Sequence, residues 1–432
     1  MRRSVFILAL MALSWSTLPL DTAHAVSAAP PDPSWQTDDI VRTVAFGNGA
    51  IYLGGEFTHV RPPGADPGVG EVVREHAAAL NRKTGDLLRW NPKVDGIVWA
   101  IAVWKSRVYL GGNFDSVGGK LRSNLAAVDA TTGDVLNWAP RANGEVRTFR
   151  LDAGGQLYVG GSFSKVNGAS RQRLAKLDRK GELTPWAPTV GQVGGDPCPP
   201  RCSPVVFSID LSTDGKTVYF GGHFGKVNGS NRNEVAAVDA GAGKTVRPWN
   251  PDVYAPTNCP TCIPNETHRV YRVIITDTKA YMCGGFWKVW HQQERAFNVL
   301  VTNLTDGHPD LVFAAADDGD TTGCELRGDV LYLGGHFNYV GAACSPNPPA
   351  GTITQKCTAD NATTRHHVAA VDARTGALLP WRPSANSNHG VWAIQKGPGS
   401  IVFIGHFTRM GGVDQEGIAR YSAHLARLWS AT

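Results

Sequence analysis

Five copies of a Gly-Gly-x-Phe motif, and two degenerate copies with Cys283 or Ile404 as the first residue, place one variable residue at an equivalent position, and several of these residues could do chemistry. The variable residues are Glu56, Asn113, Ser162, His223, Gly285, His336 and His406. Histidine titrates near neutral pH and is a common metal ligand, so three histidines and a glutamate around one ring could bind a metal or transfer protons. The simpler alternative, which we favour, is that each side chain is tucked between repeats and hydrogen-bonded to a loop.

A second set of residues follows the start of the strand that precedes each motif. Its members are Arg42, Trp99, Arg147, Phe207, Tyr271, Thr322 and Trp392. Aromatic rings could stack on sugar faces, and guanidinium groups could pair with acidic groups. We therefore predict a ligand site that includes Arg42, Trp99, Arg147, Tyr271 and Trp392. Packing between repeats is the alternative for about half of the set.

The fifth repeat departs from the others in "FAAADDGDTTGC" (313–324). Its carboxylates Asp317, Asp318 and Asp320 could bind calcium. Alternatively, Asp318 and Asp320 could act with His336 as general acid and base. A solvated acidic loop is the plainer interpretation. Because no HExxH, GxSxG or phosphate-binding glycine motif is present, we expect no cofactor apart from this calcium candidate.

Each motif belongs to a longer unit made of short strands. In the second unit, "VWAIAVW" (98–104) leads to "RVYLGGNF", then to "NLAAVDATTGD" and "VLNWAP". The motif phenylalanines recur about every 58 residues, a spacing close to that of propeller repeats with four strands per blade. We therefore predict an all-β fold: a seven-bladed β-propeller of four-stranded antiparallel blades.

Aromatic residues mark the outermost strand of each predicted blade. They are Trp90, Trp138, Trp186, Trp249, Phe313, Trp381 and Trp429. We interpret them, like the motif phenylalanines, as core between blades. Because "GIARYSAHLARLW" (417–429) supplies outer strands for the last blade, we expect the ring to close without a strand exchanged between the chain ends.

The motifs "VYLGGNF" and "NLAAVDATTGDVLNWAP" resemble those of secreted bacterial proteins built from delta-60 repeats. They are similar, more weakly, to the extracellular repeats of Rax2-type cell-polarity proteins. The resemblance covers residues 36–430 and implies a propeller fold. It implies little about activity, because such repeats occur mostly in proteins of unassigned function.

The N-terminal residues resemble a secretory signal. Arg2 and Arg3 precede an apolar run that is too short to span a bilayer, and Ala23-His24-Ala25 fits a signal-peptidase site. We expect a signal peptide at 1–25, a linker at 26–35 and one propeller domain at 36–432. The net charge of +5 is only mildly basic and does not indicate nucleic-acid binding.

Long insertions fall only in the connections at one face of the predicted ring. They are residues 61–75, 190–204, 253–268 and 342–367. Since loops on rigid scaffolds often carry function, we expect recognition at that face.

The eight cysteines are an even number in a chain expected to be exported, which favours disulfides. The nearest-neighbour pairs are Cys198 with Cys202, Cys259 with Cys262, Cys283 with Cys324, and Cys344 with Cys357. A zinc site made by "CPPRC" and "CPTC" is the alternative for the first two pairs.

Together these features predict a secreted, extracellular and monomeric binding or scaffold protein. Its expected ligand is a carbohydrate or cell-surface polymer. A carbohydrate-active hydrolase or lyase at the channel mouth and a protein–protein interaction platform are the alternatives.

Overall fold

The computed structural model describes residues 30–192, 203–253, 269–286, 298–310, 317–341, 362–387 and 389–422, and four further two-residue strands. Every regular element in these ranges is a β-strand. Within them, no helix is long and apolar enough to cross a membrane.

Seven antiparallel three-stranded sheets make up the body of the described chain. The inner strands are β2 (Val41–Gly47), β7 (Ile97–Trp104), β12 (Val146–Leu151), β18 (Val205–Leu211), β23 (Arg269–Ile275), β28 (Gly323–Arg327) and β35 (Val391–Gly397). The middle strands, which carry the glycine motif, are β3 (Ala50–Gly55), β8 (Arg107–Asn113), β13 (Leu157–Gly161), β19 (Thr217–His223), β24 (Lys279–Gly285), β29 (Val330–Gly334) and β36 (Ser400–Gly405). The third strands are β6 (Ala77–Asn81), β11 (Leu125–Asp129), β16 (Leu174–Leu177), β22 (Val235–Asp239), β27 (Val299–Asn303), β34 (Val368–Asp372) and β39 (Ile418–Ser422).

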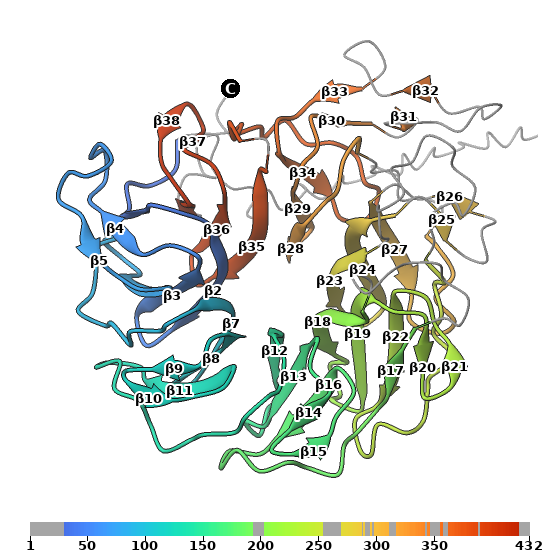
Figure 1. Cartoon of the computed structure of the whole chain (residues 1–432). Coiled ribbons are helices and arrows are strands. Elements are labelled where there is room, and N and C mark those ends of the chain that lie inside the picture. Colours follow the sequence, from blue (N-terminus) through green and yellow to red (C-terminus); the bar gives the residue numbers. More distant parts are fainter. Residues whose placement is uncertain are drawn as a thin grey trace, which may run out of the picture.

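The sheets follow one another around a common axis (Figure 1). Each inner strand contacts the inner strand of the next sheet, and β2 contacts both β35 and β36 of the last sheet. This arrangement confirms an all-β, propeller-like fold.

A short hairpin leaves each middle strand before the third strand begins. The hairpins are β4 (His59–Arg61) with β5 (Val72–Val73), β9 (Ser116–Val117) with β10 (Lys120–Leu121), β14 (Lys165–Val166) with β15 (Ala169–Ser170), β20 (Lys226–Val227) with β21 (Ser230–Asn231), β25 (Lys288–Val289) with β26 (Glu294–Arg295), β30 (Tyr339–Val340) with β33 (Thr363–Thr364), and β37 (Arg409–Met410) with β38 (Val413–Asp414). Segments that arrive from the preceding sheet pair with several of them, as β1 (Gln36–Thr37) and β17 (Val190–Gly191) do. A further pair, β31 (Cys344–Ser345) and β32 (Gln355–Lys356), lies in the long sixth insertion.

The fourth strand of each sheet is reduced to a single bridge, which differs from the predicted four-stranded blades. In the first sheet only Leu80 pairs with Leu87, and five other sheets repeat this pattern. An arginine side chain provides a further hydrogen bond to this fourth segment. In the first sheet the Arg74 guanidinium donates to the carbonyl of Leu88 at 3.1 Å. Arginines at four equivalent positions, Arg122, Arg171, Arg232 and Arg365, make the same bond.

The predicted closure is wrong at the outer edge of the last sheet. There Asp32 bridges Arg420, the residue that corresponds to Ala79 of the first sheet. Arg420 is only 6% exposed, and its Nε donates to the Asp32 carboxylate at 3.1 Å. Trp35 packs, partly buried, against the core that the first and last sheets share. Part of the segment expected to be a linker therefore completes the last sheet, while residues 423–432, with Trp429, lie outside the described ranges.

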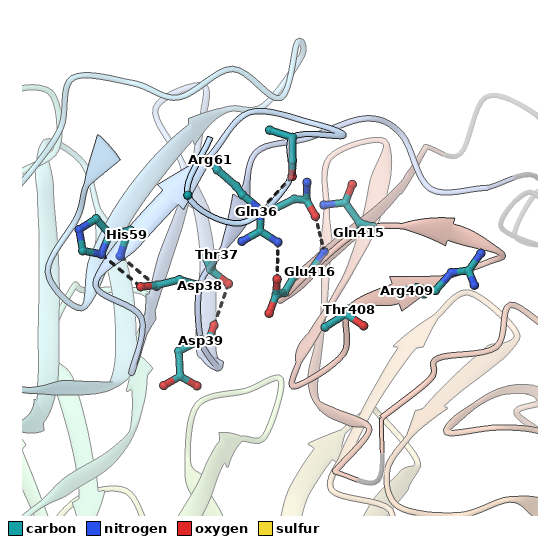
Figure 2. A network of polar contacts seen from close by, with 12 residues as sticks. Gln36, Thr37, Asp38, Asp39, His59, Arg61, Thr408, Arg409, Gln415 and Glu416 are labelled. Carbon is teal, nitrogen blue, oxygen red and sulfur yellow. Dashed lines mark hydrogen bonds and ion pairs between the residues drawn. The ribbon is translucent and has the colours of Figure 1, made fainter. Parts of the chain in front are cut away.

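Polar contacts extend this closure toward the hairpin face, as Figure 2 shows. The backbone N–H of Glu416 donates to Gln36 Oε1 at 3.0 Å, and the Glu416 carboxylate pairs with Arg61. Arg61 also donates from Nε to the carbonyl of Ala65, inside the first insertion. The first and last repeats are thus joined by backbone pairing and by a partly buried ion pair.

The second glycine of each motif is required by a close backbone approach. At Gly55 a Cβ atom would overlap the carbonyl oxygen of Ile40, just before the inner strand. The same clash with the equivalent carbonyl recurs at Gly112, Gly161, Gly222, Gly284, Gly335 and Gly405. The start of each inner strand and the variable motif residue are therefore adjacent in every repeat.

The outer tryptophans are buried core, as predicted. Trp90 is 1% exposed and meets Tyr52 edge-on at 5.1 Å between ring centroids. Its indole N–H donates to the carbonyl of Asp129, in the next sheet, at 2.9 Å. Four further Tyr–Trp pairs repeat this packing, whereas Phe313 lies outside the described residues.

One predicted disulfide is present, between Cys283 and Cys324. Cys283 stands where most repeats have the first motif glycine, and the bond joins the fifth sheet to the sixth. The pairs Cys198–Cys202 and Cys259–Cys262 lie outside the described residues, as do Cys357 and the side chain of Cys344.

We predict that replacing both Cys283 and Cys324 with alanine lowers the free energy of unfolding by about 4 kcal/mol, because the bond closes a loop across 41 residues. Urea denaturation of the double variant measures the loss. An unchanged midpoint would show that the bond does not restrain the unfolded chain.

We also predict that deleting residues 26–35 costs on the order of 3 kcal/mol or more, because the packing of Trp35 and the Asp32–Arg420 pair are lost. Deleting residues 423–432 is the matched control and should cost less. A greater loss in the control would mean that the C-terminus fills the outer position, as first expected.

Candidate functional site

A cavity of about 520 Å³ lies on the axis, between the inner strands of all seven sheets. All seven residues predicted to surround the channel mouth line it: Arg42, Trp99, Arg147, Phe207, Tyr271, Thr322 and Trp392. Each of them lies at or near the start of an inner strand, where the backbone contacts the second motif glycine. The structure thus brings the predicted ligand-binding residues together, and their binding of a ligand stays a prediction.

Four of these side chains form a continuous stack around one side of the cavity. The Arg42 guanidinium carbon lies 4.2 Å from the ring centroid of Trp392 and 4.8 Å from that of Trp99. The Arg147 guanidinium carbon lies 3.8 Å from the Trp99 ring. Because guanidinium groups already cover the Trp99 ring, a sugar has little room to stack on its face. The rings hold the arginines in place by cation–π contact.

Both arginines also have carboxylate partners. Arg42 Nε donates to Glu56 at 2.7 Å, and Arg147 Nε donates to Glu145 at 2.8 Å. The carboxylate of the motif residue Glu56 therefore pairs with an arginine of its own repeat, and it is not part of a metal site shared between repeats. An acidic ligand would therefore have to bind guanidinium groups that already have a carboxylate partner.

The cavity wall is rich in hydrogen-bond donors. Four arginines and His223 line it, while no aspartate or glutamate does among the described residues. The indole nitrogens of Trp99 and Trp392 are buried without a hydrogen-bond partner. An unpaired buried donor costs about 1–3 kcal/mol, and the indole nitrogen of Trp138, in the core, is unpaired in the same way.

The motif histidines have separate local partners, in line with the simpler interpretation. His223 Nδ1 lies 3.3 Å from Glu234 Oε1, and His406 Nδ1 lies 3.2 Å from the Ser387 hydroxyl. The His336 ring packs edge-on against Trp392, with 5.4 Å between centroids. Burial lowers the pKa of His336, which favours its neutral form.

The three aspartates of the fifth repeat have three different roles, so the structure gives them no common site. Asp317 is fully buried and accepts hydrogen bonds from Thr321 and Asn298, and burial raises its pKa well above the usual value. Asp318 accepts the backbone N–H groups of Asn338 and Tyr339, each at 2.7 Å. Asp38, Asp95, Asn143 and Asn386 cap the equivalent hairpins.

Asp320 lies beside Gly285 and next to His336. The backbone N–H of His336 donates to the Asp320 carbonyl at 2.9 Å. In the described part of the chain, no three His, Cys, Asp or Glu side chains are placed to hold a metal. The carboxylates of Asp317 and Asp318 accept separate hydrogen bonds, and the zinc alternative falls on residues outside the described ranges.

Sequence analysis missed Glu234, which lies behind His223. Its φ of 62° is in the left-handed region, and the residues before the other third strands, such as Asn124 and Asn298, share this conformation. Burial raises the pKa of Glu234 from its ordinary 4.5 to about 7. Aligning the repeats column by column would have revealed it, because Glu234 is the one carboxylate at a position that His76, Asn124, Arg173, Asn298, His367 and Gly417 hold in the other repeats.

A family model described as a domain of unknown function (DUF5122) beta-propeller matches residues 155–183. This range contains β13 to β16 of the third repeat. The match supports the propeller fold for that repeat. The delta-60 and Rax2-type resemblance stays a prediction.

Two solved structures resemble the chain at low identity. A computationally designed protein, Ika8, is 12% identical with a TM-score of 0.47, over 91% of this chain and 99% of that one. The WD40 beta propeller domain of Doa1 is 11% identical with a TM-score of 0.43, over 92% and 96%. At these TM-scores the likeness carries no argument about the site. A comparison with curated proteins finds no match.

We predict that Glu234→Gln flattens the pH dependence of stability between about pH 4.5 and 7. In that window the folded carboxyl binds a proton that the unfolded chain releases, so this residue's contribution to stability falls as pH rises. The difference between wild type and variant should reach about 1–3 kcal/mol, at 1.36 kcal/mol per pKa unit. Urea midpoints at pH 5, 6, 7 and 8 measure it, and parallel curves would contradict the raised pKa.

Proposed function

We propose that the protein is a secreted binding protein that holds an anionic carbohydrate or cell-surface polymer in the axial cavity. In this proposal the seven sheets are the blades of a seven-bladed propeller that acts as a monomer. The single observation that carries the proposal is the donor-rich wall, which four arginines and His223 line without any carboxylate among the described residues.

Charge favours an anionic ligand over a neutral one. Arg269 and Arg272 also line the cavity, Arg272 with one guanidinium nitrogen 3.0 Å from Glu325, and each guanidinium offers several donors in a fixed plane. Carboxylate or sulfate groups on a polymer would bridge such donors in pairs. Hydroxyl groups of the same polymer could accept from the indole N–H groups.

Two features support export. Residues 1–25 have the pattern of a signal peptide, although they lie outside the described ranges. The buried Cys283–Cys324 disulfide fits an oxidising compartment.

A protein-interaction platform is the second candidate, and the hairpins favour it. The exposed large apolar residues of the described chain lie on or beside hairpins of three neighbouring repeats: Val69, Val73, Leu121 and Val413. A protein partner could cover this set without using the cavity.

We predict that replacing Trp99 and Trp392 with phenylalanine weakens binding of an acidic polysaccharide by about 1–3 kcal/mol, because the ring remains while the N–H is lost. Isothermal titration with polygalacturonate, hyaluronate and neutral dextran measures affinity and charge preference.

Trp138→Phe is the matched control. Its indole nitrogen is also buried without a partner, but Trp138 lies in the core and does not line the cavity. If the cavity variant and this control bound the polysaccharide equally well, the cavity would not be the site. The hairpin surface would then be the stronger candidate.

A further inference from the structure

One sector of the cavity wall contains more ionisable groups than binding alone requires. It consists of β19, β23 and the segment before β28 (Figure 1). His223, Arg269 and Tyr271 line the cavity in this sector, while Glu234 and Asp320 lie behind them. The stack of Trp99, Arg42 and Trp392 belongs to other sheets.

Glu234 holds His223 in a defined orientation. Glu234 Oε1 lies 3.3 Å from His223 Nδ1, and Oε2 accepts the backbone N–H of Phe224 at 3.3 Å. Both side chains are largely buried, with exposed fractions of 15% for His223 and 8% for Glu234. A carboxylate that accepts Nδ1–H leaves Nε2 as the basic nitrogen of the imidazole.

The left-handed backbone of Glu234 adds an independent argument. Two equivalent positions use asparagine, whose side-chain oxygen accepts the same motif N–H: Asn124 bonds Phe114, and Asn298 bonds Phe286. Asparagine also adopts this conformation more readily than glutamate. Glu234 makes the same bond through Oε2, and its second oxygen adds the contact with His223.

Arg269 and Tyr271 face the cavity from the same strand. Both line the cavity, and the strand register shifts between Val270 and Arg272, at the position of Tyr271. The Arg269 guanidinium hydrogen-bonds the phenol, while burial raises the pKa of Tyr271. The phenol therefore keeps its proton at neutral pH and can donate it.

The fifth repeat leaves space for this arrangement. Its variable motif residue is Gly285, where a Cβ atom would overlap the Asp320 carboxylate. Arg269 lies close enough to Glu234 and Asp320 to stabilise the charged form of both carboxyls. One arginine thus lies among two carboxyls, a histidine and a tyrosine.

We propose that this sector is an acid–base catalytic site for β-elimination on a uronate-containing polysaccharide. The inference rests on the proposed binding of an anionic polymer in the cavity. Arg269 would pair with the uronate carboxylate, which makes the hydrogen on the adjacent carbon more acidic.

The reaction needs no further reactant. His223 Nε2 takes the proton from C5, the C5 electron pair forms the C4–C5 double bond, and the C4–O bond breaks. The Tyr271 phenol gives its proton to the departing glycosidic oxygen. Proton exchange with water returns His223 and Tyr271 to their starting forms. Glu234 is a positioning residue in this scheme, because it acts through His223.

The test measures binding and turnover separately, with the full mature chain. The substrates are polygalacturonate and its carboxyl-reduced, neutral form. The unsaturated product absorbs in the ultraviolet, and titration calorimetry gives the affinity. We expect product from polygalacturonate only, and a rate loss of about 10²–10⁴-fold in His223→Ala and Tyr271→Phe with binding changed by less than about threefold.

Two further variants separate catalysis from structure. Glu234→Gln should keep measurable turnover but shift the pH–rate profile, which a purely structural role would not do. His406→Ala is the matched control: this histidine is exposed, does not line the cavity, and its loss should leave the rate unchanged.

Binding of polygalacturonate without unsaturated product would overturn this inference and leave the binding proposal standing. Product formation that survives His223→Ala and Tyr271→Phe would also overturn it, because the chemistry would then lie elsewhere. If none of the acidic polysaccharides used for binding were retained, both proposals would fail.

Discussion

The contact between the second motif glycine and the carbonyl that precedes each inner strand is the constraint on which the rest of the structure depends. At Gly55 and its equivalents no side chain fits, so two backbones come close enough for the variable motif residue and the start of the inner strand to be neighbours. The repeated motif is thus architectural. It also fixes where chemistry is possible, because it delivers one variable side chain per repeat beside one cavity-lining side chain.

Contacts between sheets make the repeats interdependent. Each outer tryptophan packs on a tyrosine of its own sheet, and Trp90, Trp186 and Trp249 also donate to a carbonyl of the following sheet. Buried edge-on aromatic pairs add about 0.5–1.5 kcal/mol each beyond their area burial. A repeat in this ring is therefore stabilised largely by its neighbours.

Much of the fold and part of the site could be predicted from sequence, for a physical reason. Periodic apolar strands and the motif glycines specify each sheet, so the cavity-lining positions such as Trp99 and Trp392 follow from counting along the inner strands. The hydrogen-bond and ion-pair partners of individual side chains depend on tertiary packing, so they could not be predicted by counting along the strands. Asp318 resembles part of an acidic cluster in sequence, but it caps a hairpin like Asp95. Glu234 looks like a surface residue before "VAAVD", and only the fold shows that it reaches His223. The closure was missed because the pairing of Asp32 with Arg420 joins the two ends of the chain, and no local pattern near residues 30–35 announces it.

The pairing of Asp32 with Arg420 has a consequence for biosynthesis. The two residues are 388 positions apart in the sequence. The N-terminal segment, which is synthesised first, can therefore pair only after the last repeat has been synthesised. Until both are present, the outer edge of β39 is an unpaired strand edge, the kind of surface that other chains can join. Folding of this ring therefore cannot be completed before Arg420 has been synthesised. The interval between synthesis of the last repeat and capture of the N-terminal segment is when aggregation competes most strongly with the native fold.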